Sequence, residues 1–138
     1  MSKKKDYVIK DSGERRKFET GAQRDIVTGK GRYDLLPLTA LMNLSVHFEK
    51  GCEKYGDRNW EKGIPISVLI NSGERHIAKF IMGLEDEEHL IAAIWNFIVA
   101  KDVLNRIKLG VLPESLDDLP YTYRNVDEDK LKEMGIIQ

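Results

Sequence analysis

The sequence lacks several features that mark specialised classes of protein. It contains a single cysteine, Cys52, so no disulfide can form within the chain. No apolar run approaches the ~18 residues of a membrane span, and no apolar segment follows the basic N-terminus as it would in a signal peptide. These absences predict a soluble, cytoplasmic protein that is not associated with a membrane.

The sequence also lacks an excess of charge of one sign. Its 22 Lys and Arg residues nearly balance its 23 Asp and Glu residues, which gives a net charge of −1. Domains that bind nucleic-acid polymers are typically basic, so this balance disfavours a nucleic-acid polymer as partner. The 138 residues suffice for one domain, and they contain no repeat or low-complexity linker.

Apolar residues recur at helical spacing in three segments. The first stripe, residues 41–55, follows Pro37, which suits the first turn of a helix. The second, residues 69–84, follows Ser67, which can cap its helix. The third segment is apolar almost all round over residues 90–100, which is typical of a central, buried helix. The pattern predicts helices near residues 37–55, 67–82 and 86–108.

Shorter elements are expected at the two ends of the chain. A β-prone run at residues 7–10, a turn at 11–13 and a return over 15–18 predict a small hairpin. Residues 20–34 are expected to be a loop, and residues 127–134 to form a short amphipathic helix. We therefore expect a mainly α, single-domain fold: hairpin 1–19, helical core 20–110 and acidic C-terminal arm 111–138.

Three helices of this length make a small core for the whole chain. Two of them carry apolar stripes that need partners. We therefore expect a small helical bundle that assembles into a homo-oligomer, at least a dimer.

One carboxylate pair lies beside the apolar stripe of the first predicted helix. Glu49 and Glu53 are four residues apart and so share one ridge. Such a pair can hold a hard cation such as Mg²⁺. The alternative is a solvated helix edge on which Lys50 and Lys54 are ordinary ion-pair partners.

The beginning of the third predicted helix carries a strip of polar residues. Glu85, Glu88, His89 and Asn96 recur at helical spacing. Acidic residues are common in the first turn of a helix, because the helix dipole favours them there. Asn96 is an amide within the most apolar helix, so it either bonds a neighbouring carbonyl or faces a polar crevice that holds a metal or ligand.

The second predicted helix contributes Arg75 and His76. A lone histidine at a helix edge is more typical of a structural residue than of a ligand. Arg75 points away from its own stripe and could therefore reach the site of a second protomer.

Two loops combine basic residues with glycines. Glycine lets the backbone approach an anion closely, and arginine binds phosphate oxygens in a bidentate way. A tryptophan in such a loop can stack on a base, or can instead pin a solvated loop to the core. Neither loop is a P-loop or a dinucleotide fingerprint, and no zinc-ligand spacing occurs. The candidate ligands of the two loops are Arg24, Lys30, Arg32, Lys54, Arg58, Asn59 and Trp60.

Several segments together resemble the phage-encoded dATP/dGTP diphosphohydrolase family. The Lys-Tyr-Gly-Asp-Arg-Asn-Trp segment beginning at Lys54 is the most specific of them. The others are TGAQRD from Thr20, GKGRYDLLP from Gly29, Arg75-His76, EEHLIAAIWN from Glu87 and LDDLPY from Leu116.

The resemblance implies an all-α enzyme that hydrolyses a purine deoxynucleoside triphosphate to the monophosphate and pyrophosphate. It also implies Mg²⁺ or Mn²⁺ as cofactor and a role in a phage nucleotide pool within the host cytoplasm. Related MazG-type enzymes hold Mg²⁺ with Glu-x-x-Glu and Glu-x-x-Asp pairs, whereas Glu49 and Glu53 here are four apart.

On this hypothesis the carboxylates hold the metal and the basic loops hold the triphosphate. The catalytic residues would be Glu49, Glu53 and Glu88, and the metal ligands these three and Asp57. The substrate would contact Arg24, Lys30, Arg32, Lys54, Arg58, Asn59, Trp60, Arg75 and Asn96. The alternative is a non-catalytic phage protein, an anti-defence sponge that sequesters a nucleotide immune signal and needs no metal cluster.

Overall fold

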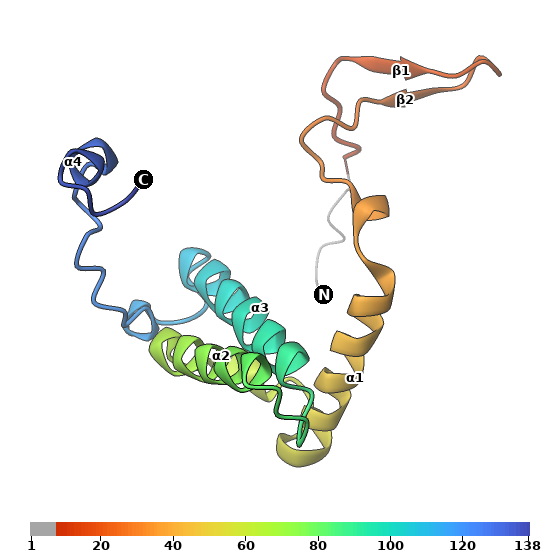
Figure 1. Cartoon of the computed structure of the whole chain (residues 1–138). Coiled ribbons are helices and arrows are strands. Elements are labelled where there is room, and N and C mark those ends of the chain that lie inside the picture. Colours follow the sequence, from red (N-terminus) through yellow and green to blue (C-terminus); the bar gives the residue numbers. More distant parts are fainter. Residues whose placement is uncertain (1–7) are drawn as a thin grey trace, which may run out of the picture. The chain divides into compact units, whose positions relative to one another are not determined.

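The computed structural model describes residues 8–138 and is mainly helical. The chain forms two compact units, a hairpin unit that ends at Pro37 and a helical unit that spans Leu38–Gln138. The first contains two short strands, and the second contains the helices α1 to α4 (Figure 1). The predicted mainly α fold with a short N-terminal hairpin is therefore confirmed.

The hairpin lies further along the chain than the sequence suggested. Strand β1 (Arg15–Lys17) pairs antiparallel with β2 (Gln23–Asp25), although residues 23–25 were expected to be loop. Residues 8–10 form no strand, and the start of the predicted first strand, Tyr7, lies outside the described residues.

Two separate turns explain this shift. The hairpin reverses near Gly21, whose φ of +87° suits glycine and whose N–H donates to the Phe18 carbonyl at 2.9 Å. The predicted turn around Gly13 also exists, but the Asp11 carboxylate ties it by accepting from the Gly13 N–H at 2.8 Å. The sequence thus identified a real turn, which is not the turn that joins the two strands.

Three long helices follow the three apolar stripes, and a fourth, short helix forms near the C-terminus. Helix α1 spans Leu38–Tyr55, α2 spans Ile66–Ile81, α3 spans His89–Lys108 and α4 spans Glu128–Glu133. The 3₁₀ turns η1, η2 and η3 span Tyr33–Leu35, Asn59–Lys62 and Glu114–Leu116.

Helix α3 begins later than predicted. It starts at His89, so the acidic residues 85–88 precede the helix rather than form its first turn. The chain leaves α2 through Gly83, whose φ is +78°, and the His89 N–H bonds the Glu87 carbonyl at 2.9 Å. This tight turn immediately before His89 is incompatible with an α-helical start upstream of it.

The core of the helical unit lies between α2 and α3, which make the most extensive helix contact. Helix α3 carries the most buried residues of the helices, as its almost continuous apolar pattern predicted. The central buried residues are Ile66, Leu69, Val99, Ala100 and Val103. Helix α1 adds Phe48 to the edge of this cluster.

The segment after α3 packs back onto the core through Leu112, Leu116 and Leu119. Gly63 makes this packing possible, since a Cβ at that position would lie 2.7 Å from a Leu116 methyl carbon. Its φ of +101° also favours glycine. The loop before α2 and the segment after α3 are therefore held against each other.

A residue far away in the sequence accepts hydrogen bonds at the N-terminus of α2. Ser67, predicted to cap this helix, is instead its second residue, and Pro65 occupies the cap position. The Asp118 carboxylate accepts from the Ser67 N–H at 2.8 Å and from its hydroxyl at 2.6 Å. A residue 51 positions away thus supplies the capping oxygens.

None of the helices in residues 8–138 has the length and apolar character needed to cross a membrane.

Candidate functional site

A cleft in the helical unit is bounded by α1, η2, α2 and α3. Its volume is about 270 Å³, and most of its lining is apolar. Small-molecule sites typically combine such a concave apolar lining with a few polar groups. The lining residues are Phe48, Gly51, Cys52, Tyr55, Gly56, Asn59, Trp60, Ile64, Val68, Leu69, Ser72, Trp95 and Asn96.

Three aromatic rings form a connected wall of this cleft. The Phe48 ring lies edge-on to Trp60, with centroids 6.0 Å apart. It is tilted against Trp95 at 5.8 Å. These rings come from α1, η2 and α3, so their arrangement depends on the packing of all three elements. Flat aromatic faces of this kind can stack on a nucleobase.

Polar groups stand at defined positions along the apolar lining. Asn96 is 6% exposed, and its side-chain N–H donates to the Ala92 carbonyl at 2.8 Å. Asn96 therefore bonds a carbonyl of its own helix and also lines the cleft, and its role in binding a ligand stays a prediction. Ser72 of α2 and Asn59 of η2 add a hydroxyl and a second amide.

The loop that carries Trp60 is fixed by charged neighbours. Arg58 adopts a left-handed φ of 57°, which is uncommon for a residue other than glycine, and donates to Glu61 at 2.8 Å. Arg106 of α3 lies over the Trp60 ring, 5.5 Å from its centroid, and pairs with Glu61 at 3.4 Å. Nothing in the sequence pattern singled out Arg106, because only the packing of α3 against η2 brings it here.

The structure brings together only part of the predicted substrate-binding set. Asn59, Trp60 and Asn96 line the cleft. Lys54 and Arg58 are exposed and flank lining residues in the chain. Arg75 is exposed on α2.

The remaining predicted basic residues lie in the hairpin unit. Lys30 pairs with Asp25 at 2.9 Å, and Arg32 pairs with Asp34 through bonds of 2.8 and 2.6 Å. Arg24 stands opposite Arg16 in the hairpin. The Ser12 hydroxyl, which bonds the Asp25 carboxylate, holds the pKa of that group well below its usual range, together with Lys30 and the Ser12 N–H.

The predicted carboxylates are placed on several segments. Glu49 and Glu53 are exposed on α1, and Asp57 is exposed in the loop that follows it. Glu88 stands at the cap position of α3. There it lines a shallow depression of about 240 Å³ with His47 and Lys50 of α1. Their role as catalytic or metal-binding residues stays a prediction.

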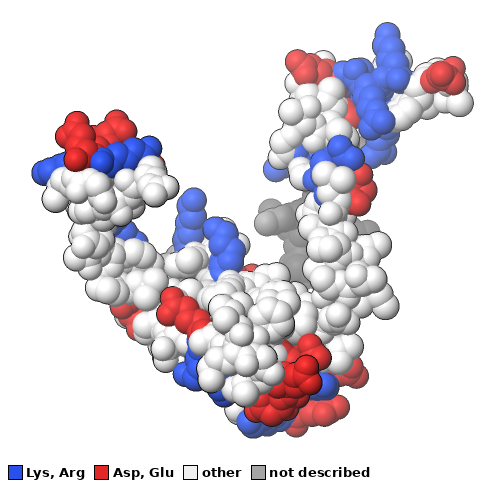
Figure 2. All heavy atoms as spheres, in the orientation of Figure 1, with Lys and Arg blue, Asp and Glu red and all other residues white. Residues whose placement is uncertain are grey.

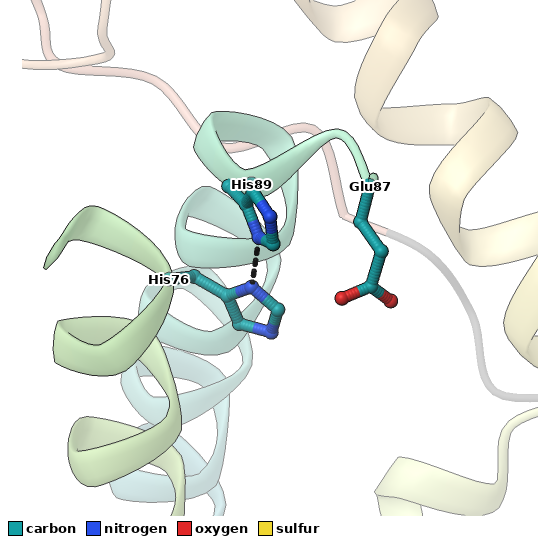
Figure 3. Close-up of side chains that lie close together, drawn as sticks. All are labelled: His76, Glu87 and His89. Carbon is teal, nitrogen blue, oxygen red and sulfur yellow. Dashed lines mark hydrogen bonds between the residues drawn. The ribbon is translucent and has the colours of Figure 1, made fainter. Parts of the chain in front are cut away.

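Histidines and carboxylates gather instead at the junction of α2 and α3. The Nδ1 atoms of His76 and His89 lie 3.0 Å apart (Figure 3). His89 Nε2 lies 2.7 Å from an Asp86 carboxylate oxygen. Glu87 offers an oxygen to the same space. Among the described residues, His76, Glu87 and His89 are the one group of three His, Cys, Asp or Glu residues close enough to share a metal ion.

The electrostatic surroundings of the histidines are mixed. Burial lowers the pKa of His76, and His47 on α1 is affected in the same way. The charge of Glu87 acts in the opposite direction on both. Figure 2 shows acidic side chains gathered at the end of the helical unit where Figure 1 places the α2–α3 connection.

Comparison with known proteins identifies the family. The family model described as dATP/dGTP diphosphohydrolase, N-terminal, matches residues 20–110, which is about two thirds of the chain. The match includes the cleft, the α2–α3 junction and the basic loops. No curated protein and no solved structure matches the chain. The protein therefore belongs to the dATP/dGTP diphosphohydrolase family, as the resemblance of its sequence motifs indicated.

Proposed function

We propose that the protein hydrolyses a purine deoxynucleoside triphosphate to the monophosphate and pyrophosphate, in the control of a phage nucleotide pool. The family match supports hydrolase activity of this kind. The observation that carries the assignment is the aromatic cleft with its buried amide, Asn96, because it offers both stacking surfaces and hydrogen-bonding groups to a base.

The cleft suits the base and not the phosphates. Trp60 and Trp95 supply ring faces, and stacking on one such face contributes ~1–3 kcal/mol to binding. Asn96 uses one N–H on Ala92, so its carbonyl oxygen and second N–H serve the ligand. A base edge carries matching donors and acceptors, whereas a triphosphate would meet a largely apolar wall.

The triphosphate would extend from the cleft toward the basic loop that borders it. Lys54 and Arg58 are next in the chain to residues that line the cleft. Both are exposed, so their charged groups are accessible to the phosphate oxygens of a bound nucleotide. Arg58 is held by Glu61 and by an unusual backbone conformation, which limits the orientations of its guanidinium. We propose that these two residues position the phosphates.

The proposed metal ligands fit Mg²⁺ by chemistry, since carboxylate oxygens are the ligands that this ion prefers. Their arrangement fits less well. No three of Glu49, Glu53, Asp57 and Glu88 converge on one point in the helical unit. Mg²⁺ or Mn²⁺ is the proposed cofactor, and when bound it would offset the charge of the phosphates.

The experiment is incubation of the protein with dATP, dGTP, dCTP and dTTP, with and without Mg²⁺ or Mn²⁺, followed by separation of the nucleotides. We expect purine monophosphate and pyrophosphate only in the presence of metal. Glu53→Gln should nearly abolish turnover and leave the fold intact, because the amide keeps the size of the side chain and loses its charge. Calorimetry of the same variant should show nucleotide affinity almost unchanged without metal.

The second candidate function is sequestration of a nucleotide without turnover. The dispersed carboxylates are the observation that favours it. In that case the wild type binds nucleotide tightly, produces no monophosphate with either metal, and releases intact nucleotide on denaturation. Such a result would eliminate the hydrolase.

A further inference from the structure

We propose that His76, His89 and Glu87 form a binding site for a divalent transition-metal ion of the Zn²⁺ type, at the junction of α2 and α3. The site uses none of the carboxylates assigned to Mg²⁺ above. The proposal concerns metal binding itself and does not depend on the hydrolase activity.

The spacing of the two imidazole nitrogens fits a shared metal ion. Metal–nitrogen bonds of 2.0–2.1 Å place neighbouring ligand atoms about 2.8–3.4 Å apart, from octahedral to tetrahedral geometry. The Nδ1 atoms of His76 and His89 are 3.0 Å apart. All three ligand atoms of the group lie within 4.8 Å of one another, so the Glu87 carboxylate closes on the pair with a small side-chain movement.

The other nitrogen of His89 is engaged as it is in metal-binding histidines. Its Nε2 lies 2.7 Å from Asp86, while the ring itself is 2% exposed. A carboxylate on the far nitrogen keeps the proton there and leaves Nδ1 with a free electron pair directed at the metal position. Asp86 is therefore a positioning residue for His89.

The ligand types, two imidazoles and a carboxylate, favour Zn²⁺ over Mg²⁺. Imidazole nitrogen is a borderline-soft ligand that suits Zn²⁺ and similar ions, whereas Mg²⁺ prefers oxygen. Two neutral imidazoles with Glu87 and Asp86 would balance the two positive charges of the ion. Three protein ligands leave one tetrahedral position open, as in sites that also hold water or a substrate group.

The competing explanation is a hydrogen-bonded link without metal. One histidine would then donate through Nδ1 to the other, and the chain Asp86–His89–His76 would simply tie α3 to α2. That link needs no contribution from Glu87, which is exposed and has no described hydrogen bond to either ring. Substitution of Glu87 therefore distinguishes the metal site from the metal-free link.

The experiment measures binding of Zn²⁺ alone by calorimetry on the full chain, with Co²⁺ as a spectroscopic probe. We expect one tight ion per chain, visible absorption of bound Co²⁺ typical of tetrahedral geometry, and no displacement by excess Mg²⁺. Glu87→Gln and His76→Ala should each weaken Zn²⁺ binding at least tenfold. Asp86→Asn should weaken it about 10- to 100-fold.

Two matched controls lie close to the group and outside it. Glu74→Gln removes an exposed carboxylate from α2, and His47→Asn removes the third histidine of the chain. Both should bind Zn²⁺ like the wild type. Circular dichroism checks the fold of each variant, and Glu87→Gln keeps the test valid if His76→Ala fails to fold, because Glu87 is exposed.

Three results would overturn the proposal. They are absence of Zn²⁺ binding by the wild type, full binding by folded Glu87→Gln, and loss of binding in His47→Asn as large as in Glu87→Gln. In each case the His76–His89 contact is a structural link between helices.

Discussion

Arg58, which directly precedes the cleft-lining residues Asn59 and Trp60, has an unusual backbone conformation. A φ of 57° places its side chain close to the following carbonyl, a conformation that costs ~1–2 kcal/mol for residues other than glycine. A glycine would adopt it without strain. The presence of an arginine at this position is therefore explained by the charge of its side chain and not by the backbone conformation, which would favour glycine.

Arg58→Gly separates these two contributions. We expect the free energy of unfolding to change by less than about 1 kcal/mol, because relief of strain offsets the greater freedom of glycine in the unfolded chain. Nucleotide affinity should fall about tenfold or more, since a bond to a charged group contributes ~1.5–3 kcal/mol. Denaturant unfolding and calorimetric titration measure the two quantities. Arg58→Lys is the control that retains the charge, and unchanged affinity in Arg58→Gly would remove this residue from the phosphate site.

Asp118 contributes stability that depends on pH. Its bonds to the side chain and N–H of Ser67 hold its pKa below the usual value of 3.8 in the folded protein. The deprotonated carboxylate therefore stabilises the fold above that value, and the contribution is lost as the pH falls through the lower, folded pKa. We expect Asp118→Ala to lower the Tm by a few degrees at neutral pH and by progressively less in acid. A Tm difference that stays constant down to pH 2 would contradict this assignment.

At the scale of elements, the contact between α2 and α3 positions both the cleft and the histidine group. Gly73 lies in the middle of α2 and is buried. A Cβ there would lie 2.4 Å from a Phe97 ring atom of α3, so the helices approach closely at this point. The same approach brings His76 next to His89 one turn further along α2.

Gly73→Ala should therefore destabilise the protein, by up to about 2 kcal/mol. The overpacking cost of about 1–3 kcal/mol is offset only in part by the gain in helix propensity, which is about 1 kcal/mol. Gly51→Ala is the matched control, because Gly51 is helical too and a Cβ there meets nothing within 4 Å. Gly51→Ala should be neutral or stabilising in urea unfolding. Equal effects of the two substitutions would show that close packing at Gly73 is unimportant.

The sequence predicted those elements whose signals are local. The three long helices follow stripes that repeat every three or four residues, so each could be predicted without its neighbours. The start of α3 at His89 was missed, because acidic residues favour the first turn of a helix and the segment before it almost equally. The position of the hairpin was missed because a turn signal does not specify which strands pair.

The candidate site was predictable only in part for the same reason. Asn59 and Trp60 belong to a basic loop and Asn96 is an amide in an apolar helix, so the sequence marks them as candidates, and all three line the cleft. Phe48 and Trp95 looked like ordinary core residues. His76 and His89 are 13 residues apart on different helices, so no local pattern shows that they meet, and only the packing of α2 against α3 brings them together.

At the scale of the whole molecule, α2 and α3 carry large apolar side chains that are exposed in the part of the chain that the structure describes. Helix α3 carries Leu90, Ile94, Phe97 and Ile98, which are 37–45% exposed. Helix α2 adds Ile81, which is 77% exposed. Contiguous apolar surface of this kind typically marks a protein–protein interface, which supports the proposed homo-oligomer.

We expect light scattering at micromolar concentration to give the mass of a dimer or a larger assembly. The double substitution Ile94→Lys and Ile98→Lys should shift the protein toward the monomer, because charges at these positions of α3 oppose their burial. Lys substitutions at Val111 and Met134, which are each 63% exposed and lie outside α3, should leave the mass unchanged. A monomeric wild type would contradict the proposed assembly.

We propose that the aromatic cleft is where a purine deoxynucleotide binds for hydrolysis. Val68 lines the cleft and is 54% exposed, so Val68→Trp fills the cleft without burying a large ring in the core. Val111→Trp, at a position that is 63% exposed and outside the cleft, is the control.

The decisive measurement is phosphorus NMR of dGTP with Mg²⁺ and each of these proteins. The wild type and Val111→Trp should convert the three triphosphate signals to those of monophosphate and pyrophosphate. Val68→Trp, with an unchanged circular dichroism spectrum, should leave the triphosphate intact. Hydrolysis by Val68→Trp at the wild-type rate would contradict the assignment of the cleft, and an intact triphosphate with the wild type would contradict the enzyme itself.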